Sequence, residues 1–280
     1  MNPFWSRLRK KPIAVIGLLV VVMHGLCAVA APWLINHDPY QLLEMPFMPP
    51  THQYWLGTDD IGRDFFSRVL MGGRLCLVVA LVSGAMAALG GGLIGLLAAC
   101  KGGLWDDVIS RVVEMKIAIP SILFVSLFVT GFGQSVVVLT IVIAIIKMMG
   151  VIRTARAQGM VLVAQGFVMA ARLRGESTAY IVLRELLPNI VDLLSVEFAL
   201  RTSSALLLVS TLSFLGLGLS PPQPDWGLMV HEGLQSIRSQ PWLILVPAAC
   251  IATLVVGINF ATDGLAEVLG LEASRGVAGH

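Results

Sequence analysis

Charged side chains are scarce in this sequence. Only 13% of its 280 residues are Asp, Glu, Lys or Arg, and 56% are hydrophobic, whereas a soluble domain normally carries about a quarter of charged residues. So little charge cannot cover the surface of a soluble fold. The composition therefore predicts an all-α, polytopic protein of the lipid bilayer. The net charge of +2 is too small to indicate a nucleic-acid partner.

Motifs that bind nucleotides, metals or cofactors are also missing. The chain has no G-x-x-x-x-G-K-[ST] sequence and no Gly-Lys pair, so ATP-driven work would need another polypeptide to bind the nucleotide. His231 and Glu232 begin like the zinc motif H-E-x-x-H, but Gln235 stands where the second histidine ligand would be. We therefore expect no catalytic residue, no metal and no cofactor on this chain.

Cysteine is rare as well. The four cysteines, Cys27, Cys76, Cys100 and Cys250, lie in or beside apolar runs and show neither metal nor redox spacing. We expect them to be small buried hydrophobic residues.

Long apolar runs dominate what is present. They lie at about 12–35, 74–99, 117–132, 136–152, 188–218 and 241–265, and they predict six transmembrane helices. The first run follows a basic start and contains Ala28-Val29-Ala30, which is similar to a signal-peptide cleavage site. Because the run exceeds a signal core of about 7–15 residues and further runs follow, we expect a retained helix.

Basic residues divide unevenly between the predicted loops. Thirteen of the 19 fall on the side of the N-terminus, at positions 7, 9, 10, 11, 101, 111, 116, 153, 156, 172, 174, 184 and 275. By the positive-inside rule this side is cytoplasmic, and both termini lie there. The expected division is an N-terminal segment with the first helix (1–35), an outer-face loop (36–73), a five-helix core (74–270) with a cytoplasmic loop (153–187), and a cytoplasmic tail (271–280).

Three charged residues of the predicted spans are candidates for a solute pathway. Glu197 and Arg201 are four residues apart and can pair on one helix face, either as a structural ion pair or as a polar lining of the pathway. Lys147 lies near the cytoplasmic end of its span. There it can pair or extend its side chain to the membrane surface, and a transport role is the alternative.

The polar stretch 166–189, GFVMAARLRGESTAYIVLRELLPN, separates two apolar runs. Helix formers followed by Gly175 predict a short helix with a glycine C-cap. Ser177 or Thr178 can then cap a second helix, which we expect to end at Pro188. Two helices joined at a glycine would form a rigid elbow between membrane spans.

Within this stretch, F-V-x-A-A-R-x-x-G followed by L-P-N resembles the coupling loop of permeases of ATP-binding-cassette importers. G-T-D-x-x-G-R-D-x-x-S-R (57–68) and SFLGLGLSPPQPDWG (213–227) resemble further motifs of the dipeptide, oligopeptide and nickel uptake group. The chain is similar to the second permease subunit of this group from about Trp55 to Leu269. The resemblance implies a six-helix permease of the type I importer architecture in a bacterial inner membrane.

The resemblance also implies partners and contact residues. The partners are a homologous second permease subunit in a heterodimer, two ATPase subunits that hold ATP and magnesium, and an extracytoplasmic solute-binding protein. Small alanines would let the ATPase come close to the elbow, and the implied coupling residues are Phe167, Val168, Ala170, Ala171, Arg172 and Gly175. Met169 stands where many members of the wider superfamily carry a carboxylate, so the resemblance does not extend to an acidic contact there.

An outer-face docking element for the binding protein is implied at Gly57, Thr58, Asp59, Arg63 and Asp64. From the residues alone, Asp59, Asp60 and Asp64 alternate with two arginines on a compact surface element. Because Arg63 and Arg68 stand among the carboxylates, Asp–Arg pairing and turn capping are favoured over a Mg²⁺ or Ca²⁺ site.

The solute stays open between di- or oligopeptides and nickel or a metal chelate, and we favour peptides as the larger group. A stand-alone secondary transporter or channel is an alternative of a different class. It would favour an internal repeat, and none is visible between the two halves of the sequence.

Overall fold

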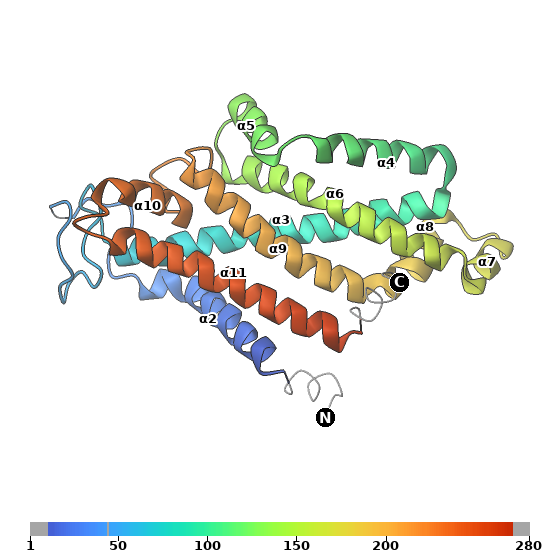
Figure 1. The fold of residues 1–280 in the computed structure, drawn as a ribbon, viewed down its shortest axis with the longest axis horizontal. Coiled ribbons are helices and arrows are strands. Elements are labelled where there is room, and N and C mark those ends of the chain that lie inside the picture. The colour runs from blue at the N-terminus through green and yellow to red at the C-terminus, as the bar shows by residue number, and fades with distance from the viewer. Residues whose placement is uncertain (1–10, 44, 271–280) are drawn as a thin grey trace.

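The computed structural model describes residues 11–43 and 45–270. The basic residues at 7, 9, 10 and 275 and the predicted tail 271–280 therefore lie outside the described residues. The described part is almost wholly helical, with one isolated β-bridge between Thr58 and Asp64. Long helices run side by side along one axis and form an elongated bundle (Figure 1), which confirms the all-α prediction.

Within the described residues, five helical runs are long and apolar enough to cross a membrane. They are α2 (Pro12–Leu34), α3 (Phe65–Lys101), α6 (Val136–Val163), the run Thr178–Phe214 and α11 (Trp242–Val268). The boundaries correct two predictions. Helix α3 begins at Phe65 rather than near 74, because Asp64 caps it by accepting a hydrogen bond from the backbone N–H of Ser67 at 3.0 Å. Helix α6 continues past 152 to Val163.

The predicted span 117–132 is not a straight helix. Helix α4 (Gly103–Ala118) and α5 (Ser121–Phe132) meet at an angle of 92° across a two-residue break, and this bent pair has the length and composition of either a broken sixth span or a re-entrant loop. Ile119 has an extended backbone (φ −85°, ψ 123°), as expected for a residue that precedes a proline. Pro120 therefore ends the charged helix α4 instead of kinking a continuous helix.

Pro188 does the opposite and lies within a continuous helical run. Helix α8 (Thr178–Tyr180) continues through a π-helical turn η1 (Ile181–Leu186) and a 3₁₀ turn η2 (Leu187–Ile190) into α9 (Val191–Phe214). Pro188 sits in the first turn of η2, where its missing N–H matters little. The wider hydrogen-bonding ring of the π turn precedes the proline, and the chain stays helical where a break was predicted.

Glycines set the closest helix contacts. A Cβ on Gly91 would lie 2.7 Å from the Cβ of Val151, and one on Gly95 would lie 2.7 Å from the carbonyl oxygen of Ile152. The G-x-x-x-G spacing of α3 thus lets α6 approach its backbone. Helix α3 packs along both α6 and α9 in the centre of the bundle, and α2 packs on α11.

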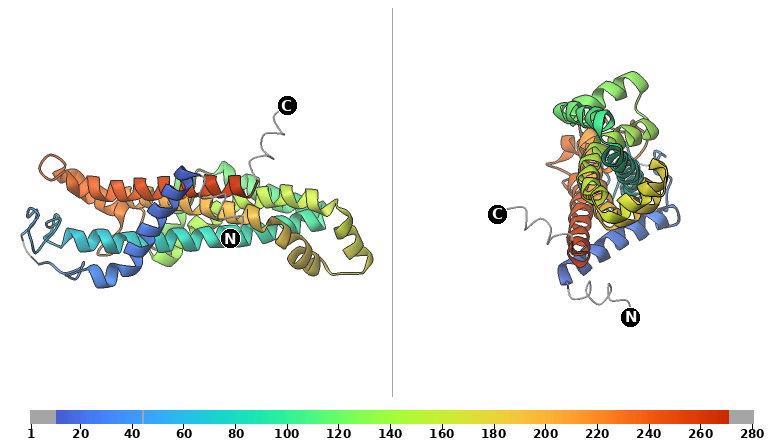
Figure 2. Two further views of the ribbon diagram at one scale, coloured as in Figure 1. Left: turned by 90° about the horizontal axis from the view of Figure 1, so that it is seen from below. Right: turned by 90° about the vertical axis from the view of Figure 1, so that its right-hand side faces the viewer.

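The two ends of the bundle differ. Residues 35–43 and 45–64 lie at one end together with α10 (Trp226–Gly233) and the 3₁₀ turn η3 (Leu234–Ser236), and we call this the loop end (Figure 1). Helix α7 (Gly166–Leu173) projects from the other, which we call the elbow end (Figure 2, left). Lys11 forms an ion pair with Glu267, so the start of α2 lies beside the end of α11.

Candidate functional site

The elbow has the helix ends that its sequence predicts. Gly175 has a φ of 79°, the left-handed conformation that glycine adopts most readily. Its N–H donates to the carbonyl of Arg172 at 3.0 Å, and the N–H of Glu176 donates to the carbonyl of Ala171 at 3.2 Å. This pair of bonds is a Schellman motif. Ser177 then caps α8 by accepting from the N–H of Tyr180 at 3.2 Å.

The two faces of α7 have different neighbours. Val168 and Ala171 are fully buried in a cluster with residues of α3, α6 and η1, so they anchor the elbow to the bundle. Met169 and Leu173 are 62% and 85% exposed, and Ala170 is exposed beside them. Only one of the two alanines therefore offers a close approach to another protein, because neighbouring helix residues point about 100° apart.

Two arginines of the elbow form contacts within this chain. Arg172 donates from Nη2 to the carbonyl oxygen of Cys100 at 2.9 Å, in the last turn of α3, where helix carbonyls lack partners of their own. Arg174 contacts Glu185 at 3.3 Å. These contacts fix the angle of α7 against α3 and η1. Phe167 is half-buried against the same cluster.

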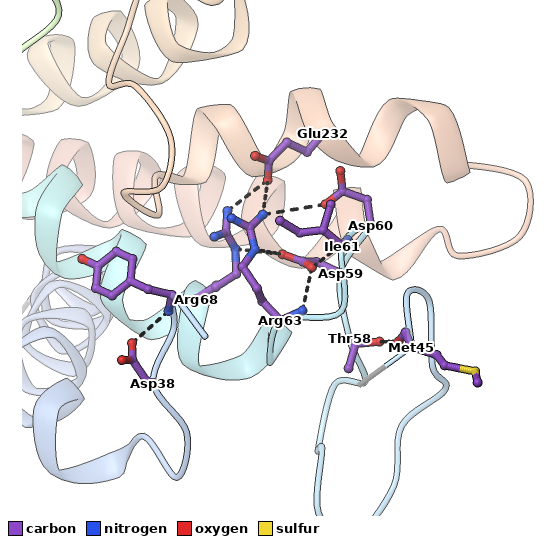
Figure 3. Close-up of polar contacts among 10 residues, drawn as sticks. Asp38, Met45, Thr58, Asp59, Asp60, Ile61, Arg63, Arg68 and Glu232 are labelled. Carbon is purple, nitrogen blue, oxygen red and sulfur yellow. Dashed lines mark hydrogen bonds and ion pairs between the residues drawn. The ribbon is translucent and has the colours of Figure 1, made fainter. Parts of the chain in front are cut away.

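At the loop end, charged residues gather around two arginines (Figure 3). Asp59 accepts from Nε of Arg63 at 2.6 Å and pairs with Nε of Arg68 at 3.2 Å. Nη2 of Arg68 donates to Oε2 of Glu232 in α10 at 3.0 Å, and both guanidinium groups point toward this carboxylate. Arg63 also pairs with Asp60 at 3.7 Å. The Asp–Arg pairing is present, as the residues predict.

The predicted surface position of this element is wrong. The side chains of Asp59, Arg63, Asp64 and Arg68 are each at most 4% exposed. Helix α10, which is distant in the sequence, packs over this element. The carboxylates of Asp59, Asp60 and Glu232 lie near enough to one another to hold a cation, but the two guanidinium groups occupy the space among them. Burial raises the pKa of Glu232, and Arg68 and Arg63 oppose this rise. Burial and the nearby Asp59 raise the pKa of Asp60.

Backbone contacts shape the same loop. Thr58 donates its hydroxyl to the carbonyl of Met45 at 2.8 Å and accepts from the N–H of Met48 at 2.9 Å. Gly57 has a φ of 75°, and a Cβ there would lie 2.2 Å from the carbonyl oxygen of Met48. Glycine is therefore required at this turn. Residues 57, 58, 59, 63 and 64 therefore hold this loop in one conformation.

Sequence reasoning missed the contribution of α10. Glu232 lies 164 residues from Arg68, and no local pattern pairs them. Trp226 donates its indole N–H to the carbonyl of Val69 at 2.8 Å, and a Cβ on Gly73 would lie 2.4 Å from the indole ring. The sequence shows the Trp-Gly pair after the prolines. It does not show that Gly73 of α3 leaves the space for the indole ring of Trp226.

In the middle of the bundle, Glu197 and Arg201 form the predicted ion pair. Oε2 of Glu197 accepts from Nε and Nη2 of Arg201 at 2.8 and 2.5 Å. Glu197 is buried, whereas Arg201 keeps a quarter of its side chain exposed. Lys147 is half-buried and has no carboxylate within 4.0 Å among the described residues, so the alternative of local pairing is not seen for it.

The cysteines are only partly as expected. Cys76 and Cys100 are buried, whereas Cys27 is exposed on the bundle and Cys250 is half-exposed. Cys76 donates from Sγ to Asp225 at 3.1 Å, and Asp225 caps α10. Burial raises the pKa of Asp225, while the hydrogen bond from Cys76 opposes the rise.

Known protein families match both parts of the chain. Residues 91–272 match the family of the binding-protein-dependent transport system inner membrane component. Residues 2–50 match the N-terminal transmembrane domain of oligopeptide transport permease C. The two matches together cover most of the sequence.

Relatives are similar over most of both chains. A probable D,D-dipeptide transport system permease protein of Escherichia coli (strain K12) is 34% identical over 263 residues, 94% of this chain and 88% of the relative. A dipeptide transport system permease protein of Alkalihalophilus pseudofirmus is 34% identical over 95% and 88% of the two chains. A glutathione transport system permease protein of Escherichia coli O157:H7 is 34% identical over 96% and 89%. The helical bundle, the family match and these similarities show that the chain belongs to the inner membrane components of binding-protein-dependent transport systems, as a permease subunit of an ATP-binding-cassette importer.

Proposed function

We propose that this chain forms half of a pathway for di- or oligopeptides across a bacterial inner membrane. A homologous second permease forms the other half, two ATPase subunits bind at the elbow end, and a solute-binding protein delivers peptides at the loop end. The names of the three relatives support a peptide, since they refer to a D,D-dipeptide, a dipeptide and glutathione. Nickel or a metal chelate is the alternative that uptake measurements exclude or establish.

The observation that carries the proposal is the difference between the two faces of the elbow helix α7. Its inner face is anchored by Val168 and Ala171, and its outer face presents Met169 and Leu173 to the surroundings. An exposed apolar patch on a rigid, projecting helix is typical of a protein contact surface. Met169 and Leu173 are four residues apart and share one face of α7, which suits insertion into a groove on an ATPase.

The distribution of charge supports the orientation. Basic residues crowd the elbow half of the bundle, at Lys11, Lys101, Arg153, Arg156, Arg172, Arg174 and Arg184. The loop end has Arg63, Arg68 and Arg238. By the positive-inside rule the elbow end faces the cytoplasm, where ATPase subunits and ATP are found. Closure of the ATPases on ATP would then move the elbows of both permeases together and open the pathway outward.

The test is affinity purification of the complex with the substitutions Met169→Lys and Leu173→Lys combined. Because charged side chains resist burial in an apolar contact, we expect at least about a tenfold loss of co-purified ATPase. The control is Leu42→Lys, which changes another well-exposed leucine at the loop end and should leave the ATPase bound. Purified complex in proteoliposomes is then assayed for ATP-driven uptake of dialanine and of a nickel chelate.

Full ATPase binding by the elbow variant would contradict the docking role of α7. A wild-type chain that purifies without any ATPase and still transports by ion coupling would contradict the importer assignment of the complex. Uptake of the nickel chelate without uptake of dialanine would replace the peptide by a metal.

A further inference from the structure

A cleft with charged residues in its wall is lined by α4, α6 and α9; Figure 1 shows where these three helices lie. Its volume is about 1030 Å³, at the upper end of the range of small-molecule sites and large enough for a short peptide. Its lining begins at Ile117 and Ala118, beside the bend between α4 and α5, and extends to Ala157 of α6. The cleft therefore runs from the middle of the bundle toward the elbow end.

Positive charge exceeds negative charge in this cleft. Arg153, Arg156, Arg201 and Glu114 line it. Arg156 is neutralised by Asp106, with Nη2 and Oδ2 2.5 Å apart, and Glu114 pairs with Arg111 at 3.2 Å. Arg153 is exposed and has no carboxylate within 4.0 Å among the described residues. Among the charged groups that line the cleft, Arg153 is therefore the one without an ion-pair partner in the described part of the chain.

Arg201 is fixed in place at the wall of the cleft. Glu197 holds its Nε and Nη2, and the guanidinium group lies on Gly150 of α6. A Cβ at Gly150 would be 2.9 Å from Nη1 of Arg201, so a glycine is needed for this approach. Nη1 is not used by Glu197 and remains available as a donor. A fixed donor binds a ligand with little loss of side-chain entropy.

Lys147 adds to the positive potential. It lies three residues before Gly150 and so shares that face of α6, and its amino group is not paired with a carboxylate in the described part of the chain. In a half-buried site with a low effective dielectric, such charges act over several ångströms. The cleft should therefore attract anions and repel cations, a free nickel ion included.

We propose that this cleft binds the terminal carboxylate of the transported peptide, with Arg153 and Nη1 of Arg201 as its donors. The inference rests on the proposed peptide-import function and adds a chemical requirement to it: a peptide with a free carboxylate is held at the cytoplasmic side of the pathway. Arginine suits this role, since its planar guanidinium group can bind a carboxylate through two hydrogen bonds.

The test places a reporter thiol in the cleft of the complete complex in nanodiscs. Ala157 is exposed and lines the cleft without carrying charge, so Ala157→Cys is introduced in a Cys27→Ser, Cys250→Ser background. Its reaction rates with an anionic and a cationic methanethiosulfonate are compared at low salt. We expect the ratio of anionic to cationic rates to exceed that of a free thiol by about tenfold and to fall as salt is raised.

Two further measurements identify the charge and the ligand. Arg153→Gln should bring the rate ratio toward that of a free thiol, whereas Arg238→Gln, an exposed arginine at the loop end, should not. Trialanine should protect the thiol at concentrations at which trialanine amide does not, and Arg153→Gln should abolish this difference. Unchanged rate ratios, equal protection by the amide, or a thiol that reacts with neither reagent would each overturn the proposal.

Failure of the proposed function has a different signature. If the wild-type complex does not drive ATP-dependent uptake of trialanine, peptide import is wrong whatever the thiol reports. If it takes up trialanine and the thiol shows neither anion preference nor selective protection, only the carboxylate site is wrong.

Discussion

Single residues of this chain serve the fold and the partner surfaces at the same time. Arg172 belongs to the coupling motif, yet its guanidinium group binds the end of α3. Ala171 belongs to the same motif and is fully buried. We expect such residues to transmit motion by holding the elbow against the bundle, and we expect the exposed Met169 and Leu173 to contact a partner. A substitution at Arg172 should thus loosen the elbow without changing its outer face.

Arg68 gives the sharpest prediction at this scale. Arg68→Met should destabilise the protein by about 3–5 kcal/mol, because Glu232 and Asp59 would lose a buried cation. The measurement is thermal unfolding of the purified complex. Arg111→Met, which breaks a pair whose side chains are 80% and 65% exposed, is the control and should cost less than about 1 kcal/mol.

Adding Glu232→Gln to Arg68→Met should recover part of the loss, since the neutral amide no longer needs the cation. The double-mutant cycle measures this coupling. Additive effects of the two substitutions would show that the 3.0 Å contact between Arg68 and Glu232 contributes no coupling energy.

The way each helix ends determines how it is joined to the next element. Helix α7 stops at a Schellman motif, and α4 stops where Ile119 becomes extended before Pro120. The helical run Thr178–Phe214 does not break at Pro188, because a π turn and a 3₁₀ turn carry the chain across it. The elbow is therefore one short helix joined by a capped turn to a long helical run, and we expect a movement of α7 to be carried into α9.

Gly175 tests this connection. Gly175→Val forces a β-branched residue into the left-handed region, at a cost of roughly 1–2 kcal/mol, although no atom lies within 4 Å of the new Cβ. We expect the complex to assemble and hydrolyse ATP while peptide uptake per ATP falls several-fold. Gly175→Asn is the matched control, since asparagine tolerates this conformation. Equal uptake per ATP in the two variants and the wild type would argue against a rigid elbow.

At the scale of the whole molecule, the two ends of the bundle differ in the interactions and elements that form them. Buried ion pairs and proline-rich turns hold the loop end, whereas short helices with an apolar outer face form the elbow end. The cleft of α4, α6 and α9 lies between the centre and the elbow end. This polarity suits a subunit that meets a binding protein on one side and an ATPase on the other.

Sidedness can be measured directly. In a Cys27→Ser, Cys250→Ser background, Leu42→Cys should react with a membrane-impermeant maleimide in intact spheroplasts, and Leu173→Cys only after permeabilisation. Both leucines are well exposed on the chain itself, at 64% and 85%, and the permease is labelled in cells that lack its ATPases, so that no bound ATPase covers Leu173. Labelling of Leu173→Cys from outside would reverse the proposed orientation.

The sequence alone determined the fold class, the order of the spans and the caps of the elbow. Composition dictates that a chain with 13% charged residues must bury itself in lipid, and a cap such as Ser177 or Gly175 depends on neighbours within a few residues. The ion pair of Glu197 with Arg201 was foreseeable for the same reason, because one helical turn joins them.

Only the tertiary structure decided which of these residues face inward. Whether Ala170 or Ala171 is buried depends on how α7 packs against η1 and α6. The guanidinium group of Arg68 meets Glu232 only when α10 folds back across the loop end. Likewise, the sequence does not show that Arg153 lacks an ion-pair partner among the described residues. This becomes clear only when the packing of α4 and α6 pairs Asp106 with Arg156. Such contacts join segments far apart in the chain, so they depend on the packing of whole helices and leave no local signal in the sequence.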